Sequence, residues 1–94
     1  MTPEKVLEVT DIYRTRFKDG PEWIAPVQNC HEHNPYSHHE ALEHCASMLD
    51  KIDEFARNDR MEKAFRWLGF VQGVLWVCGL YTIDELKAHN MPPE

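Results

Sequence analysis

The sequence predicts a small all-α domain that forms an obligate oligomer. Apolar residues recur at spacings of three and four, and capping residues precede these segments. The segment 62–79 is apolar on more than one face, whereas a helix on the surface of a small monomer needs a single apolar stripe. Ninety-four residues leave little protein to cover a second face, so we expect another subunit to cover it.

We expect four helices in a single helical domain over residues 1–94. Their approximate ranges are 2–19, 38–58, 60–79 and 83–89. Thr2 is a suitable N-cap before Pro3, and Gly20 followed by Pro21 ends the first helix. A short turn joins the second and third helices, which are expected to form a long antiparallel hairpin.

Further capping residues mark the other helix starts. Ser37 with Glu40, and Thr82 with Glu85, have the spacing of a hydroxyl and a carboxylate in a capping box. We expect Asp59 to begin the third helix in a similar way. The core stripe of that helix is expected to consist of Phe65, Leu68, Val71, Leu75 and Cys78. The apolar residues left over are Trp67, Phe70, Val74, Trp76 and Val77.

Residues 21–36 form a long connection with three prolines and no clear period. Loops of this length inside a small domain are often functional or wrap a neighbour. The formal charge of −6 argues against a general DNA- or RNA-binding protein, although a local basic patch could hold a small anionic ligand. We therefore expect neither DNA nor RNA as a partner.

The polar, acidic start of the chain predicts no secretory signal, and the apolar run in the third helix is too short for a membrane span. Cys30, Cys45 and Cys78 are odd in number and widely spaced, which favours reduced thiols. We expect a cytoplasmic protein that does not bind membranes.

The first candidate site lies near the end of the first helix. Tyr13 and Phe17 are four residues apart and share a helix face, as do Arg14 and Lys18. A nucleotide needs such a pairing, because rings stack on its base and cations meet its phosphate. The alternative is that the rings belong to the core and the cations complement the helix dipole.

Five histidines between His31 and His44 lie beside Cys30 and Cys45, and zinc uses such ligands. The spacing is poor, because His39 and His44 are five residues apart and diverge on a helix. The loop cysteine also has no C-x-x-C partner. We predict no metal site and expect solvated or hydrogen-bonded histidines.

Arg66 is a charged residue inside an otherwise apolar helix, next to Trp67. It either pairs with Glu62, four residues earlier, or reaches a phosphate at a subunit boundary. Ser37 and Ser47 have no triad partners, and no Gly-rich phosphate loop is present. We therefore expect neither an enzyme nor a cofactor.

Three runs carry a resemblance to a known family: ALEHC at 41–45, EKAFRWLGFVQGVLW at 62–76 and YTIDELKAHN at 81–90. They resemble the anti-CBASS sponges, small phage proteins that share a helical-hairpin domain with anti-Thoeris sponges. The resemblance covers most of residues 37–90. It implies a homohexamer in the cytoplasm of an infected bacterium. It also implies capture of cyclic di- and trinucleotides between protomers, without cleavage.

In such sponges an aromatic residue on the first helix stacks on a base, and Tyr13 matches it. A basic residue of the following segment meets phosphate, but residues 24–29 contain no Lys or Arg. Either Arg14, Arg16 or Lys18 replaces it, or this member favours a different ligand. Arg66 is the best cation for a second type of site. The candidate ligand-binding residues are Tyr13, Arg14, Phe17, Lys18, Gln28 and Arg66.

The predicted function is sequestration of cyclic di- and trinucleotide signals, which would block CBASS immunity and let a phage evade it. The alternative is a protein-interaction module that inhibits a host protein through the apolar face of the helix at 60–79. The mass in solution distinguishes them, because a monomer favours the second.

Overall fold

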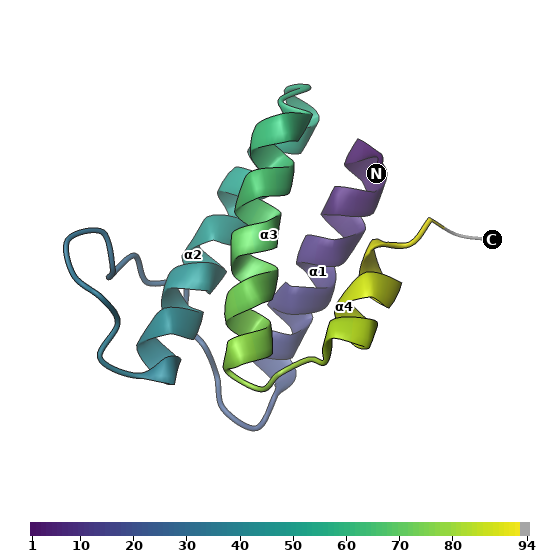
Figure 1. The fold of residues 1–94 in the computed structure, drawn as a ribbon. Coiled ribbons are helices and arrows are strands. Elements are labelled where there is room, and N and C mark those ends of the chain that lie inside the picture. Colours follow the sequence, from purple (N-terminus) through teal and green to yellow (C-terminus); the bar gives the residue numbers. More distant parts are fainter. Residues whose placement is uncertain (93–94) are drawn as a thin grey trace.

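The computed structural model describes residues 1–92 and contains helices but no strand within them. The helices are α1 Pro3–Asp19, α2 His38–Arg57, α3 Met61–Val77 and α4 Ile83–Asn90. α2 and α3 form an antiparallel hairpin, α1 packs along α2, and the short α4 lies against α1 (Figure 1). The all-α prediction is confirmed. Within residues 1–92, no helix has both the length and the apolar character needed to cross a membrane.

The core lies where α1, α2 and α3 meet. Its largest fully buried side chains are Val6, Val9, Thr10, Tyr13, Cys45, Leu49, Ile52, Val71 and Leu75. α3 turns the stripe Ala64, Leu68, Val71 and Leu75 inward. The prediction that Phe65 belongs to this stripe is wrong, because its side chain is 40% exposed. Ala64 takes the inward position four residues before Leu68, which turns Phe65 outward.

Two of the predicted capping interactions are present as expected. Thr2 accepts a hydrogen bond from the backbone N–H of Lys5 at 3.1 Å. Thr82 and Glu85 form both bonds of a capping box. Ser37 forms only its half of such a box, with the backbone N–H of the residue three positions on.

The predicted start of α3 is wrong. Asp59 has a φ of 59°, in the left-handed region, and Arg60 is the N-cap without a side-chain capping bond. The turn from α2 into α3 needs one left-handed residue, which aspartate tolerates better than most side chains. The same conformation leaves the carboxylate of Asp59 without a capping role.

The segment between α1 and α2 is held along the first half of α2. The backbone N–H of Ile24 donates to the carbonyl of Phe17 at 2.9 Å. Further along, the backbone N–H of Val27 donates to the carbonyl of Glu43 at 3.3 Å. The side chain of Asn29 donates to the Glu43 carboxylate at 3.2 Å. These bonds bring the middle of the segment beside α2.

The capping box of α4 gives a first prediction. Replacing Thr82 by Ala removes the side-chain bond to the Glu85 N–H, so the free energy of unfolding should fall by about 1 kcal/mol. The measurement is urea denaturation. The control is Thr15→Ala, at an exposed position inside α1, which should have little effect. Equal losses in the two variants would contradict a capping role for Thr82.

Candidate functional site

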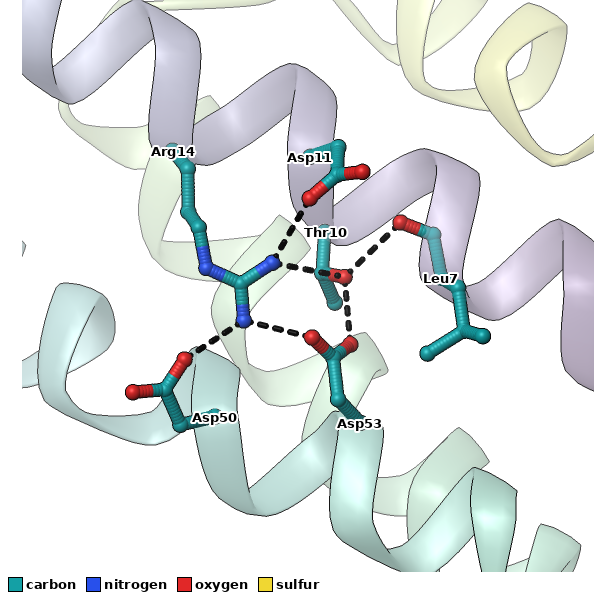
Figure 2. A network of polar contacts seen from close by, with 6 residues as sticks. All are labelled: Leu7, Thr10, Asp11, Arg14, Asp50 and Asp53. Atoms are coloured by element: carbon teal, nitrogen blue, oxygen red, sulfur yellow. Dashed lines mark hydrogen bonds and ion pairs between the residues drawn. The ribbon is translucent and has the colours of Figure 1, made fainter.

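Arg14, a predicted phosphate contact, is surrounded by carboxylates (Figure 2). It donates to Asp53 at 2.5 Å, to Asp50 at 2.7 Å and to Asp11 at 2.9 Å. Burial by itself would lower the pKa of Arg14, but hydrogen bonds and charge from Asp53 and Asp50 outweigh it and raise that pKa. Three carboxylates around one guanidinium leave a negative surface, which repels phosphate. Arg14 therefore joins α1 to α2.

Tyr13, the predicted base-stacking residue, is fully buried with 0% exposure. Its hydroxyl accepts a hydrogen bond from the Gln72 amide at 2.9 Å and forms a second hydrogen bond with Nδ1 of His89 at 3.1 Å. Burial raises the pKa of Tyr13 to about 12, although the bond from Gln72 opposes it. Phe17 is also buried. In this conformation neither ring has a free face for a base, so both match the core alternative.

Arg14, Phe17 and Lys18 nevertheless line one small cavity of about 280 Å³. Trp23, which the sequence analysis did not single out, lines the same cavity and is 65% exposed. Asp50 also lines it. Because Arg14 is already paired with that carboxylate, Lys18 is the remaining cation for an anionic ligand here.

Gln28 and Arg66 line a different cavity, of about 490 Å³. It lies between α2, α3 and the segment that joins α1 to α2, which we call the connecting segment. We call this cavity the α2–α3 groove. Its lining residues are Gln28, His31, His44, Ser47, Met48, Lys51, Arg66, Trp67 and Phe70. Four of them are Lys, Arg or His and none is a carboxylate, although the chain has a formal charge of −6. The groove is therefore a local basic site on an acidic protein.

Each helix supplies its part of the α2–α3 groove from one face. On α2, His44 and Lys51 are seven residues apart, which is two helical turns. On α3, Arg66 and Phe70 are four residues apart. The Trp67 ring lies edge-on to the ring of Phe55, with centroids 5.0 Å apart, and this contact fixes its position. The rigid hairpin thus presents cations and aromatic rings together.

Arg66 is free to meet a ligand. The predicted alternative, an ion pair with Glu62, is not formed, and no carboxylate in the part of the chain that the structure describes lies within ion-pair distance of Arg66. Its guanidinium is exposed at the edge of the groove. Such a group binds phosphate through two parallel N–H donors.

Two imidazoles also line the α2–α3 groove, with ring centroids 5.2 Å apart. Nε2 of His31 faces the Gln28 amide at 2.7 Å. Nδ1 of His44 accepts the backbone N–H of Cys30 at 3.3 Å. Burial and the nearby His31 lower the pKa of His44. At neutral pH His44 is therefore an uncharged anchor of the connecting segment.

Other histidines hold the segment through carboxylates. His39 lies 2.9 Å from a carboxylate oxygen of Glu22, and His33 lies 3.7 Å from Glu40. Cys30 contacts the same Glu40 oxygen at 3.5 Å. Between residues 1 and 92, no group of three or more His, Cys, Asp or Glu side chains could hold a metal ion.

A third surface, on the other side of α3, is apolar. A cavity of about 710 Å³ runs along it. Its lining includes Tyr36, Gly69, Phe70, Gly73, Val74, Trp76 and Val77. Tyr36, Phe70, Trp76 and Val77 are exposed there. We call this surface the α3 apolar face. Of the residues that the sequence analysis left over from the core stripe, Phe70, Trp76 and Val77 are thus exposed in one chain, whereas Trp67 and Val74 pack partly against the core.

The sequence analysis missed Lys51, Trp23, His31 and His44 as residues that line these cavities. A helical signal for Lys51 was present, because it shares a face with His44 two turns earlier. The histidines were considered as metal ligands or as solvated, hydrogen-bonded side chains, but not as part of a cavity. No sequence signal places residues 28 and 31 against α2, since that approach depends on bonds to residues 10 to 16 positions further along the chain.

No model of a known protein family, no curated protein and no solved structure matches this chain. The functional argument therefore rests on the geometry and chemistry of the surfaces described above.

The paired carboxylates of α2 give a second prediction. Asp53→Asn leaves Arg14 without its buried partner charge and should lower the free energy of unfolding by about 2 kcal/mol. Asp50→Asn removes an exposed partner of the same guanidinium and should cost less than about 0.5 kcal/mol. Urea denaturation of both variants provides the comparison. Equal losses would show that burial of Asp53 does not matter.

The bond between Tyr13 and His89 gives a third prediction. Burial lowers the pKa of His89, Glu85 opposes the shift and Lys5 adds to it. The unfolded chain then binds a proton more readily than the folded one, so His89 adds stability above about pH 6.5 that is lost as the pH falls below that value. Urea denaturation at about pH 7.5 and about pH 5.5 should show this loss.

The control for this prediction is His89→Gln, which keeps a hydrogen-bonding side chain but cannot titrate. Its stability should fall less on acidification than that of the wild type. An equal fall in both proteins would assign the effect to other groups, of which His44 shifts in the same direction.

Proposed function

We propose that this protein binds small anionic cyclic oligonucleotides in the α2–α3 groove and sequesters them without cleavage. The observation that carries the proposal is the composition of that groove. The cavity is lined by Lys51, Arg66 and two histidines, with Trp67 and Phe70 beside them, and its lining contains no carboxylate. The chain as a whole has a formal charge of −6. Its volume of about 490 Å³ lies in the range of about 300–1,000 Å³ usual for ligand pockets.

Each lining residue has a role that its chemistry supports. Arg66 has no carboxylate partner within residues 1–92, and Lys51 has only an exposed ion pair with Glu54 at 3.5 Å, so both can supply positive charge from two helices to a ligand with two or more phosphodiesters. Trp67 and Phe70 supply the ring faces on which nucleotide bases stack. Gln28 offers both a donor and an acceptor to a base edge.

The groove supports capture rather than hydrolysis. Ser47 is the hydroxyl in its lining, and that hydroxyl donates to the backbone carbonyl of His44 at 2.5 Å. The proton of Ser47 is thus directed to a carbonyl and not to an imidazole, so the pair lacks the arrangement of a nucleophile and its base. Tight burial of an intact signal needs no such pair.

The resemblance to anti-CBASS sponges points to the same ligand class, cyclic di- and trinucleotides. Under this proposal a phage protein in the host cytoplasm removes the signal before it activates a host effector. The groove differs from the site that the resemblance implied, because Tyr13 is buried and Arg14 is paired. Two of the candidate residues of the sequence analysis, Gln28 and Arg66, line it.

We further propose that the α3 apolar face binds other copies of this chain. Trp76 and Val77 expose large apolar side chains on it, and Gly69 and Gly73 leave room for a close helix approach. The resemblance implies a hexamer. The second candidate function uses the same face differently, since a monomeric protein would offer it to a host protein and inhibit that protein by docking.

The fourth prediction tests the α2–α3 groove. Arg66→Gln should weaken binding of cyclic di-AMP or cyclic tri-AMP by at least about tenfold, because it removes a charge-assisted phosphate contact. Arg57→Gln makes the same charge change on α2 outside the groove and is the matched control. Calorimetric titration measures both, and chromatography of the recovered ligand tests its integrity. Equal affinities, or a cleaved ligand, would contradict the proposal.

The fifth prediction tests self-association. Val77→Lys places a charge on the α3 apolar face and should reduce the mass of the assembly measured by sedimentation at micromolar concentration. Met91→Lys is the control, because this side chain is similarly exposed but does not line the face. A monomeric wild type would overturn self-association and favour the protein-interaction alternative.

A further inference from the structure

Two further cations lie beside the α2–α3 groove, on the side towards the turn that joins α2 to α3. The ammonium of Lys63 lies 5.9 Å from the ring centroid of Trp67, which lines the groove. The same ammonium lies 4.8 Å from the ring centroid of Phe55 on α2. The guanidinium carbon of Arg60 lies 5.4 Å from that centroid. We call Arg60, Lys63 and Phe55, which lie outside the groove lining, the Phe55 cluster.

The spacing along α3 places the Phe55 cluster in line with the groove. Lys63 and Trp67 are four residues apart and share a side of α3 with Phe70, three residues further on. At the rise of an α-helix, Lys63 lies about 6 Å along the axis from Trp67. The rings of Phe55 and Trp67 are in edge contact, with centroids 5.0 Å apart. A ligand in the groove that extends along α3 would therefore reach the cluster.

The positive charge of the Phe55 cluster has no counterion in the chain. Within residues 1–92, neither Arg60 nor Lys63 forms an ion pair. The carboxylates nearest to the cluster in sequence are Glu54, Asp59 and Glu62. Of these, Glu54 pairs with Lys51 at 3.5 Å. An aromatic ring attracts a cation through its quadrupole but carries no net charge, so both cations can still attract an anion.

The chemistry of the Phe55 cluster suits a phosphate monoester. Contact with two rings already restricts the Lys63 side chain, which therefore loses less rotamer freedom when an anion binds. Lysine meets phosphate as a compact point charge, and the guanidinium of Arg60 adds a fork of N–H donors. A phosphate monoester carries close to two negative charges at neutral pH, and two cations can balance them.

We propose that Arg60 and Lys63 form a subsite for a terminal phosphate, through which the protein also binds linear oligonucleotides that occupy the α2–α3 groove. This inference rests on the function proposed above and adds a second class of ligand. A cyclic dinucleotide has no terminal phosphate, and its phosphodiesters lie within one compact ring. A linear dinucleotide can extend along α3, so its end reaches past Trp67. Hydrolysis of one phosphodiester in a cyclic dinucleotide produces such a linear molecule.

The test is calorimetric titration of the full chain with three probes. These are cyclic di-AMP, a linear diadenylate with a terminal phosphate monoester, and the same diadenylate without that phosphate. The phosphorylated linear probe should bind at least about tenfold more tightly than the unphosphorylated one, because it adds charge-assisted contacts. This comparison uses the wild type alone, so it does not depend on the folding of a variant.

Substitutions of Lys63 assign the phosphate to the subsite. Lys63→Gln should weaken binding of the phosphorylated linear probe by at least about tenfold and change the affinity for cyclic di-AMP little. Lys63→Arg keeps the charge and the ring contacts, so it should bind as the wild type does. Lys87→Gln makes the same charge change on α4, outside the groove, and is the matched control. Circular dichroism confirms that the variants are folded.

The outcomes separate this inference from the proposed function. Equal affinity for the two linear probes, or equal losses in Lys63→Gln and Lys87→Gln, would overturn the subsite and leave sequestration of cyclic di-AMP intact. An equal loss for cyclic di-AMP in Lys63→Gln would overturn a subsite specific to the terminal phosphate. Binding of the phosphorylated linear probe alone would support the subsite and overturn the proposed cyclic ligand. No binding of any probe would overturn both.

Discussion

Asp53 carries a carboxylate into the contact between α1 and α2, where its side chain is only 6% exposed. A buried carboxylate is costly unless charge and hydrogen bonds compensate it, and here Arg14 and Thr10 do so from α1. Because both partners are on α1 one turn apart, they fix how α1 lies along α2. The same placement turns the ring of Tyr13 into the core. The position of this one carboxylate thus determines which side chains of α1 are buried or paired and which remain available to contact a ligand.

This constraint separates the basic residues of the chain by role. The guanidinium of α1 is occupied by carboxylates of its own chain, so it stabilises the helix packing. The cations Lys51 and Arg66 line a groove whose lining contains no carboxylate, although Lys51 also pairs with the exposed Glu54 beside it at 3.5 Å. In a protein with a formal charge of −6, this absence gives the α2–α3 groove its attraction for anions. The same hairpin leaves the α3 apolar face open for association.

Helix positions followed from the sequence because their signals are local. Caps such as Thr82 with Glu85, and apolar spacing along each helix, depend on residues within a few positions of one another. The exception, the start of α3, failed because the turn requires a left-handed residue at Asp59. The extent of α3 itself was still predicted to within two residues at each end.

The site was harder to predict because it depends on distant contacts. A ring four residues from another, as in Tyr13 and Phe17, fits a core stripe and a stacking site equally well. The partner that decides the role of Arg14, Asp53, is 39 residues away. Gln28 and Arg66 were both named as candidates, yet nothing local shows that they face each other across α2. Oligomer size, ligand and the absence of catalysis stay predictions.

The three tryptophans report on the three candidate surfaces separately, which provides the most direct test. Trp67 lines the α2–α3 groove, Trp23 lines the cavity beside α1, and Trp76 lines the α3 apolar face. The measurement is fluorine NMR of the protein labelled with 5-fluorotryptophan, titrated with a cyclic dinucleotide. The account predicts that the Trp67 signal shifts most. A shift confined to Trp23, or no shift at any tryptophan, would contradict it.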